Sequence, residues 1–177
     1  MTSNFDAAHV HLLVNHFPII LSAIGLIAAL VALATRRRAV WVYALATLTI
    51  SGVTAYPVML TGHAAEDVME KKWYVVKDAI HEHEEASDWA TWMLLAMGVA
   101  SAYGWYRLVR QPEAKGPPAW VQAAVIVTAL LGATTSARTA WLGGKIVYGS
   151  PRLVPVPPGT PPADTAASPE GEGDMKH

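Results

Sequence analysis

Four long stretches of the sequence contain no aspartate, glutamate, lysine or arginine, and they constrain the fold more than any other feature. A helix that crosses the hydrocarbon core of a bilayer needs about 20 mostly apolar residues, whereas the helices of a soluble bundle carry charge on their outer faces. Only 15% of the residues are charged, against about a quarter in an ordinary soluble domain. We therefore predict an all-α integral membrane four-helix bundle. Its membrane-embedded segments would be residues 17–35, 40–60, 89–106 and 120–140.

Basic residues predict how this bundle is oriented. Arg36, Arg37 and Arg38 fill the turn after the first span, and Arg107, Arg110 and Lys115 flank the turn between the third and the fourth. Short loops rich in lysine and arginine stay in the cytoplasm. Both termini and the long connection between the second and third spans would then lie outside. Because no basic region and cleavage site precede the first hydrophobic stretch, we expect it to be a retained helix.

Two segments differ from the spans. Between Gly62 and Ile80, apolar residues recur at helical spacing with charges between them, which predicts an amphipathic helix on the outer surface. Residues 149–177 are rich in Pro, Ala and Gly and predict a disordered tail, which leaves residues 1–148 as the membrane domain. Within that domain, Trp41 is expected in the inner aromatic belt. Gly132 and Ser136, four residues apart, would let a neighbouring helix approach closely.

Six of the seven histidines lie at the predicted outer ends of the first three spans. At a rise of about 1.5 Å per residue, His11, Glu66 and His83 stand at one height, roughly 9 Å above the hydrocarbon edge. His16 and His63 would lie lower, roughly 2–5 Å above it. Two imidazoles and a carboxylate at one level suit Fe, Cu or Zn. The candidate metal ligands are therefore His11, His16, Glu66, His83 and Glu84.

Histidines on different helices of a bundle also suit the two axial positions of haem b. The candidate haem ligands are His11, His16 and His83, with His63 as a further one. Arg138, at the outer end of the fourth span, would hold a propionate or pair with Glu66 or Glu84. The chain has no cysteine, which excludes disulfides, iron–sulfur clusters and covalent c-type haem within it. Solvated helix ends and a proton-handling cluster are the alternatives to a cofactor site.

The sequence is compatible with three functions. The first is a membrane subunit that passes electrons between other membrane subunits and a soluble outer protein such as a c-type cytochrome. The second is a non-haem metal-binding protein or metal enzyme, and the sequence does not identify its catalytic residues. The third is a structural accessory subunit without a cofactor. A net charge of −1 gives no sign of nucleic-acid binding. Hydrolase motifs such as Gly-x-Ser-x-Gly and His-Glu-x-x-His do not occur.

Three short motifs carry a resemblance to a known family. They are His-Val-His-Leu-Leu-Val-Asn-His-Phe-Pro at residues 9–18, Thr-Gly-His-Ala-Ala-Glu at 61–66 and Ile-His-Glu-His-Glu at 80–84. Over residues 8–148 the chain resembles a family of uncharacterised four-helix proteins of the bacterial inner membrane. The positions that match the family's motifs are His11, His16, Glu66, His83 and Glu84, whereas His9, His63 and His81 are additions of this chain. The resemblance implies haem or metal binding beside electron-transfer proteins, and it brings no established activity.

Overall fold

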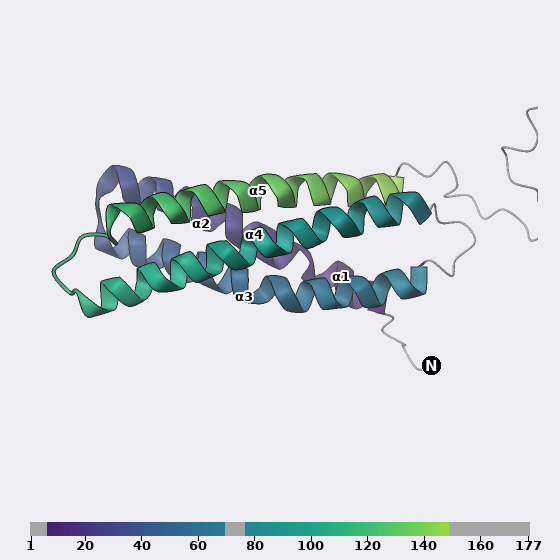
Figure 1. Ribbon diagram of the computed structural model, residues 1–177, viewed down its shortest axis with the longest axis horizontal. Coiled ribbons are helices and arrows are strands. Elements are labelled where there is room, and N and C mark those ends of the chain that lie inside the picture. Colours follow the sequence, from purple (N-terminus) through teal and green to yellow (C-terminus); the bar gives the residue numbers. More distant parts are fainter. Residues whose placement is uncertain (1–6, 70–76, 149–177) are drawn as a thin grey trace, which may run out of the picture.

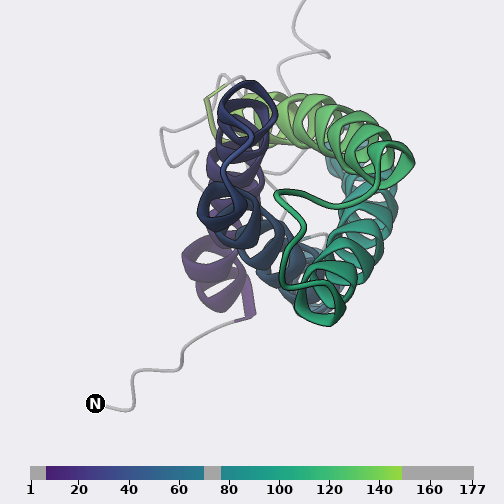
Figure 2. The same cartoon turned by 90° about the vertical axis from the view of Figure 1, so that its left-hand side faces the viewer.

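The computed structural model describes residues 7–69 and 77–148, and the regular structure in these two ranges is helical (Figure 1). The helices are α1 (Ala7–Val14), α2 (His16–Thr35), α3 (Arg38–Met69), α4 (Lys77–Arg110) and α5 (Ala119–Tyr148). Helices α2 to α5 surround a common axis, and the connection from α4 to α5 crosses one end of the bundle (Figure 2). The short helix α1 packs on α3. The prediction of an all-α four-helix bundle is confirmed.

Three helical segments of the described chain are long and apolar enough to cross a membrane, so the chain is a membrane protein. They are His9–Thr35, Arg38–Asp67 and Ala119–Ile146. Helix α4 has a lower hydropathy, since its first part is charged and its uncharged stretch, residues 89–106, is rich in Trp and Tyr. These amphipathic rings favour the membrane interface. Because α4 runs beside α3 and α5 (Figure 1), the fourth predicted span remains consistent with the bundle.

One proline, Pro18, lies in the first turn of α2, just after the break from α1, and another, Pro57, lies inside α3. Proline lacks an amide hydrogen, and its ring clashes with the carbonyl group four residues earlier. Pro18 therefore disfavours a continuous helix through Val14, and the chain breaks at Asn15. Pro57 does not end α3, which continues to Met69. A separate amphipathic helix is expected at residues 62–80. The first part of this segment instead continues α3 to Met69, and its last part, from Lys77, begins α4. Residues 70–76 lie outside the described chain.

Small residues decide how closely the helices pack. A Cβ atom added to Gly52 of α3 would lie 2.6 Å from the Cα of Gly98 and 2.7 Å from the carbonyl oxygen of Leu94, both in α4. These partners are backbone atoms and cannot rotate away, so α3 and α4 touch backbone to backbone at this point. Gly132 of α5 makes a looser approach, since an added Cβ would meet a Leu94 methyl group at 3.1 Å.

Trp41 corrects one expectation. It was predicted to sit in the inner aromatic belt, where an indole ring faces the lipid headgroups. Instead its side chain is only 1% exposed and belongs to the apolar core. The connection between α4 and α5 covers it, because a Cβ atom on Gly116 would lie 2.8 Å from the indole nitrogen. Hydropathy alone does not predict that Trp41 is buried, because the segment that covers it lies far away in the sequence.

Arg38 closes the end of the bundle at which α4 terminates. Its guanidinium donates hydrogen bonds to the carbonyl oxygens of Leu108 at 2.8 Å, and of Gln111 and Ala114 at 3.0 Å. The last carbonyl groups of a helix have no partner within the helix. Arg38 therefore satisfies the end of α4 and ties the first residue of α3 to the loop before α5.

We expect Arg38→Ala to lower the free energy of unfolding by about 2 kcal/mol, since charge-assisted hydrogen bonds contribute about 1.5–3 kcal/mol each and this group is partly solvated. Thermal unfolding in detergent would shift down by about 4–8 °C. Arg37→Ala is the matched control, because Arg37 is exposed and its loss removes the same charge. Equal melting temperatures for the two variants would contradict the capping role.

The two ends of the bundle differ in charge, although Arg138 and Lys145 of α5 also lie towards the acidic end. The basic residues of segments 36–38 and 107–115 lie at the end with the α2–α3 and α4–α5 connections (Figure 1). The acidic and histidine-rich parts of α3 and α4 lie at the opposite end, together with the end of α5. The one-sided histidine distribution expected from the sequence therefore corresponds to one end of the bundle.

Candidate metal centre

Helices α3 and α4 bring histidines and carboxylates together at the acidic end of the bundle. The two helices follow each other in the chain and run antiparallel (Figure 1). On one helix face, residues three, four and seven positions apart lie above one another. His63 and Glu66 share such a face on α3, and His81, Glu84 and Asp88 share one on α4. These two faces contact each other through ion pairs and a hydrogen bond.

Glu66, His81 and Glu84 form the tightest group. One ligand atom from each lies within 4.8 Å of the others. The Nδ1 atom of His81 is 3.7 Å from Oε1 of Glu66 and 3.5 Å from Oε2 of Glu84. Both separations exceed the usual N–H···O hydrogen-bond length of about 2.7–3.2 Å. They are close to the edge of a tetrahedron of ligands around zinc, which is about 3.4 Å for metal–ligand distances of about 2.1 Å.

His63 and Asp88 adjoin this group. The Nε2 atom of His63 is 3.2 Å from Oδ1 of Asp88 and 3.8 Å from Oε1 of Glu84. Glu84 therefore directs one carboxylate oxygen towards His81 and the other towards His63. The five side chains form one continuous cluster across α3 and α4.

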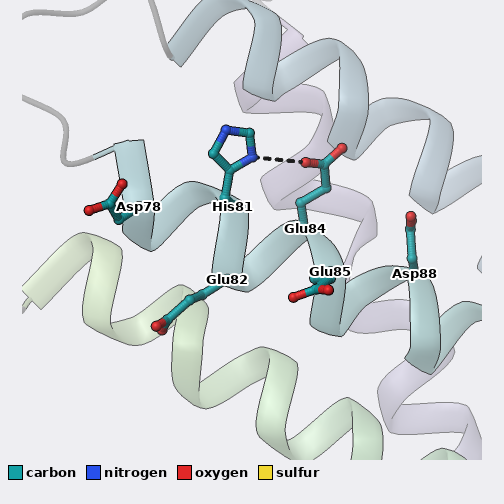
Figure 3. Close-up of a pocket in the computed structure, with 6 residues that line it drawn as sticks. All are labelled: Asp78, His81, Glu82, Glu84, Glu85 and Asp88. Carbon is teal, nitrogen blue, oxygen red and sulfur yellow. Dashed lines mark ion pairs between the residues drawn. The ribbon is translucent and has the colours of Figure 1, made fainter.

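Acidic residues surround the cluster on α4. An open depression of about 470 Å³ is lined by Asp78, His81, Glu82, Glu84, Glu85 and Asp88. In Figure 3, His81, Glu84 and Asp88 leave α4 on the side that faces α3, whereas Glu82 leaves it on the opposite side. Five carboxylates and a single imidazole give the depression a negative potential, which concentrates cations near the ligands.

Two further histidines, His11 and His83, are partly buried and contact other residues than this cluster. The Nδ1 atom of His11 is 3.1 Å from the Thr61 hydroxyl oxygen, and that hydroxyl donates its proton to the Val58 carbonyl at 2.7 Å. His11 must then be the donor to Thr61. The Nδ1 of His83 donates to the Thr139 carbonyl at 3.0 Å. In both rings Nδ1 carries the proton, which leaves the Nε2 lone pair available in the neutral imidazole.

Two glycines make room for these rings. A Cβ atom on Gly62 would lie 3.1 Å from Cε1 of His11, and one on Gly143 would lie 3.1 Å from Cε1 of His83. Burial lowers the pKa of His83 below its ordinary value, although its hydrogen bond to the Thr139 backbone opposes this shift. The neutral form of His83 is therefore favoured near neutral pH.

The structure groups the predicted residues differently from the expectation. Glu66 and Glu84 do meet, but their imidazole partner is His81, which does not match a position of the family's motifs. His83, two residues later, points to α5 instead. His16 and His9 are exposed. Within residues 7–69 and 77–148, the exposed Arg138 pairs with neither Glu66 nor Glu84.

One sequence signal could have identified His81. His81 and Glu84 are three residues apart, and this spacing places two side chains on one helix face. The predicted heights relied only on the distance along each helix and took no account of the direction in which each side chain points. The side chains of His81 and His83 point in different directions, because residues two apart lie on nearly opposite sides of a helix.

No protein-family model, no curated protein and no solved structure matches this chain. The resemblance to the four-helix family of the bacterial inner membrane stays a prediction.

Proposed function

We propose that the chain is a membrane metal-binding protein that holds a divalent transition-metal ion through Glu66, His81 and Glu84. The observation that carries the proposal is the placement of one ligand atom from each residue within 4.8 Å of the others. Imidazole and carboxylate ligands together suit zinc, iron or manganese, and iron- and manganese-binding bundles use glutamate and histidine ligands three residues apart. Two carboxylates and a neutral imidazole would balance a divalent charge.

The exposure of the ligands supports an exchangeable or reactive metal in place of a purely structural one. The Glu66 side chain is 14% exposed, whereas the His81 side chain is 65% exposed. The site is closed towards the bundle and open towards the depression on α4. Structural zinc sites use four protein ligands, whereas sites with three protein ligands keep a position for water or substrate. Metal transfer and metal-assisted catalysis both need such an open position.

The charge distribution supports an outer location for this site. Loops rich in lysine and arginine remain on the cytoplasmic side, and the metal centre lies at the other end of the bundle. We infer that the protein lies in the bacterial inner membrane with its metal centre and its N- and C-termini on the periplasmic side. A soluble periplasmic protein could reach the exposed His81 directly.

The test is metal binding by the purified full-length protein in detergent. We expect Zn²⁺ to bind in stoichiometric amounts, and His81→Ala to weaken its binding by at least about 10-fold, as loss of a ligand or its support does elsewhere. His9→Ala is the matched control, because it removes an exposed imidazole from α1. The proposal fails if the wild-type protein binds no zinc by elemental analysis, or if the two variants bind zinc equally.

A second candidate is electron transfer through haem b held by His11 and His83. The observation that favours it is that both rings have the same tautomer. In each ring Nδ1 donates a hydrogen bond, and the Nε2 lone pair can bind iron. An axial haem ligand needs this arrangement, and a second hydrogen bond fixes the ring as it does for other metal-bound histidines. Other membrane subunits and a periplasmic c-type cytochrome would be its electron-transfer partners.

The visible spectrum of a native membrane preparation tests the haem candidate. We expect a Soret band that shifts on reduction and that His83→Ala abolishes, with His16→Ala as the control on an exposed imidazole. A pigment-complete preparation without this band excludes the haem candidate and leaves the metal site unaffected. If neither zinc nor haem binds, a structural accessory subunit is the remaining function.

A further inference from the structure

We infer that a pocket at the basic end of the bundle binds the headgroup of an anionic phospholipid. The basic end is the one with the α2–α3 and α4–α5 connections, opposite the metal centre (Figure 1). The pocket has a volume of about 420 Å³ and is lined by Leu33, Arg36, Trp41, Lys115 and Gln122. None of these residues belongs to the metal centre, so the inference does not depend on metal binding.

Three helices and one connection form this pocket. Leu33 lies in the last turn of α2, and Arg36 follows that helix directly. Trp41 lies in the first turn of α3, and Gln122 lies in the first turn of α5. Lys115 belongs to the connection from α4 to α5, which crosses the end of the bundle (Figure 2). The packed bundle therefore brings together two basic residues that lie far apart in the sequence.

The charge of the pocket favours an anion. Its charged lining residues are Arg36 and Lys115, and no acidic residue of the described chain lines it. Within residues 7–69 and 77–148, neither of the two forms an ion pair with a carboxylate. A guanidinium and an ammonium that line one pocket suit a phosphate group, because arginine can bind two phosphate oxygens at once and lysine adds a point charge.

The backbone of Arg36 supports a role for its side chain. Arg36 ends α2 in the left-handed conformation, with φ 52° and ψ 31°. Glycine commonly occupies this position after a helix, because a Cβ atom is disfavoured there. In the described ranges, Arg36 alone among the non-glycine residues has a positive φ. Strained backbone of this kind is found at ligand-binding positions, and here it keeps a cation at the pocket.

Apolar and polar neighbours favour a lipid over free phosphate. Leu33 is 47% exposed on a helical segment apolar enough to cross a membrane, which places it against acyl chains beside the two cations. The Gln122 amide nitrogen donates to the Pro117 carbonyl at 2.7 Å, so its side-chain oxygen can accept a hydrogen bond from a headgroup hydroxyl. Basic pockets between helices on the cytoplasmic side of membrane proteins bind anionic headgroups, and the basic turns predict this side.

Native mass spectrometry of the full-length protein in detergent tests the inference, with phosphatidylglycerol, phosphatidylcholine and inorganic phosphate as separate additions. We expect one phosphatidylglycerol molecule to stay bound per chain. Its affinity should exceed that of phosphatidylcholine, which has no net charge, by at least about 10-fold, because two basic residues contact the headgroup. Inorganic phosphate lacks the acyl chains and should not displace phosphatidylglycerol at equal concentration.

Four variants locate the binding site. Arg36→Gln and Lys115→Gln should each lower the affinity for phosphatidylglycerol by about 5-fold, the effect of one basic residue near an anionic headgroup. Arg37→Gln is the matched control, because Arg37 is exposed and does not line the pocket. Arg36→Gly separates binding from folding, since glycine adopts a positive φ without strain. This variant should melt at or above the wild-type temperature without lipid and still lose affinity.

Three outcomes would overturn the inference. Equal losses in Arg36→Gln and Arg37→Gln would mean that the basic end attracts anionic lipids only through diffuse charge. Equal binding of the two phospholipids would mean that the pocket does not recognise a negative headgroup. Displacement of phosphatidylglycerol by inorganic phosphate at equal concentration would assign the pocket to free phosphate. Each of these results leaves the proposed metal centre untouched.

Discussion

Gly52→Ala is expected to lower the free energy of unfolding by about 2–3 kcal/mol, as overpacking of a tight interior does. The new methyl group would lie 2.6 Å from the Cα of Gly98 and 2.7 Å from the Leu94 carbonyl oxygen. Since both atoms belong to the α4 backbone, only a separation of the two helices can relieve the clash. Thermal unfolding in detergent, followed by circular dichroism, should shift down by about 5–10 °C.

Gly144→Ala is the matched control for this prediction. It makes the same chemical change inside a helix, yet an added Cβ atom at Gly144 meets nothing within 4 Å. Alanine is favoured over glycine in a helix by about 1 kcal/mol, so this variant should melt at the same temperature or higher. If Gly52→Ala also melts at or above the wild-type temperature, the helices are not held in backbone contact at Gly98.

Glu84→Ala is expected to weaken Zn²⁺ binding by about 100-fold or more, the largest loss among single ligand substitutions. Glu84 lies within 3.8 Å of both His63 and His81, so its removal takes a ligand from the group and leaves both imidazoles without this carboxylate. Loss of a group that only supports a metal ligand already costs about 10–100-fold in affinity, and loss of a ligand itself should cost more. Isothermal titration of the detergent-purified protein with Zn²⁺ measures the effect.

Glu82→Ala provides the control for charge. It removes the same charge from the same helix and from the lining of the same depression, but the Glu82 side chain points away from α3 (Figure 3). We expect its zinc affinity to fall no more than a few-fold through the weaker negative potential. If Glu82→Ala and Glu84→Ala lose affinity equally, the carboxylates attract cations only as a diffuse charge, and direct coordination by Glu84 is wrong.

The candidate site was predictable in part. The residue types and the end of the bundle follow from the sequence, because six histidines and several carboxylates stand at the same ends of the predicted spans. The partner of Glu66 does not follow from height alone. Glu66 and His83 were expected at one level, but His83 faces α5 and His81 faces Glu66. A helix turns about 100° per residue, so a two-residue difference changes the neighbouring helix.

The sequence by itself determined the membrane class, the helical content and the gathering of histidines at one end, because charge-free stretches and basic turns act locally. Only the tertiary structure decided which imidazoles meet which carboxylates. That choice depends on the rotation of each helix about its axis and on the register between α3 and α4. Both are fixed by contacts between distant residues, such as the approach of Gly52 to Gly98. The histidine-rich end is thus a property of the sequence, and the Glu66, His81 and Glu84 cluster is a property of the packed bundle.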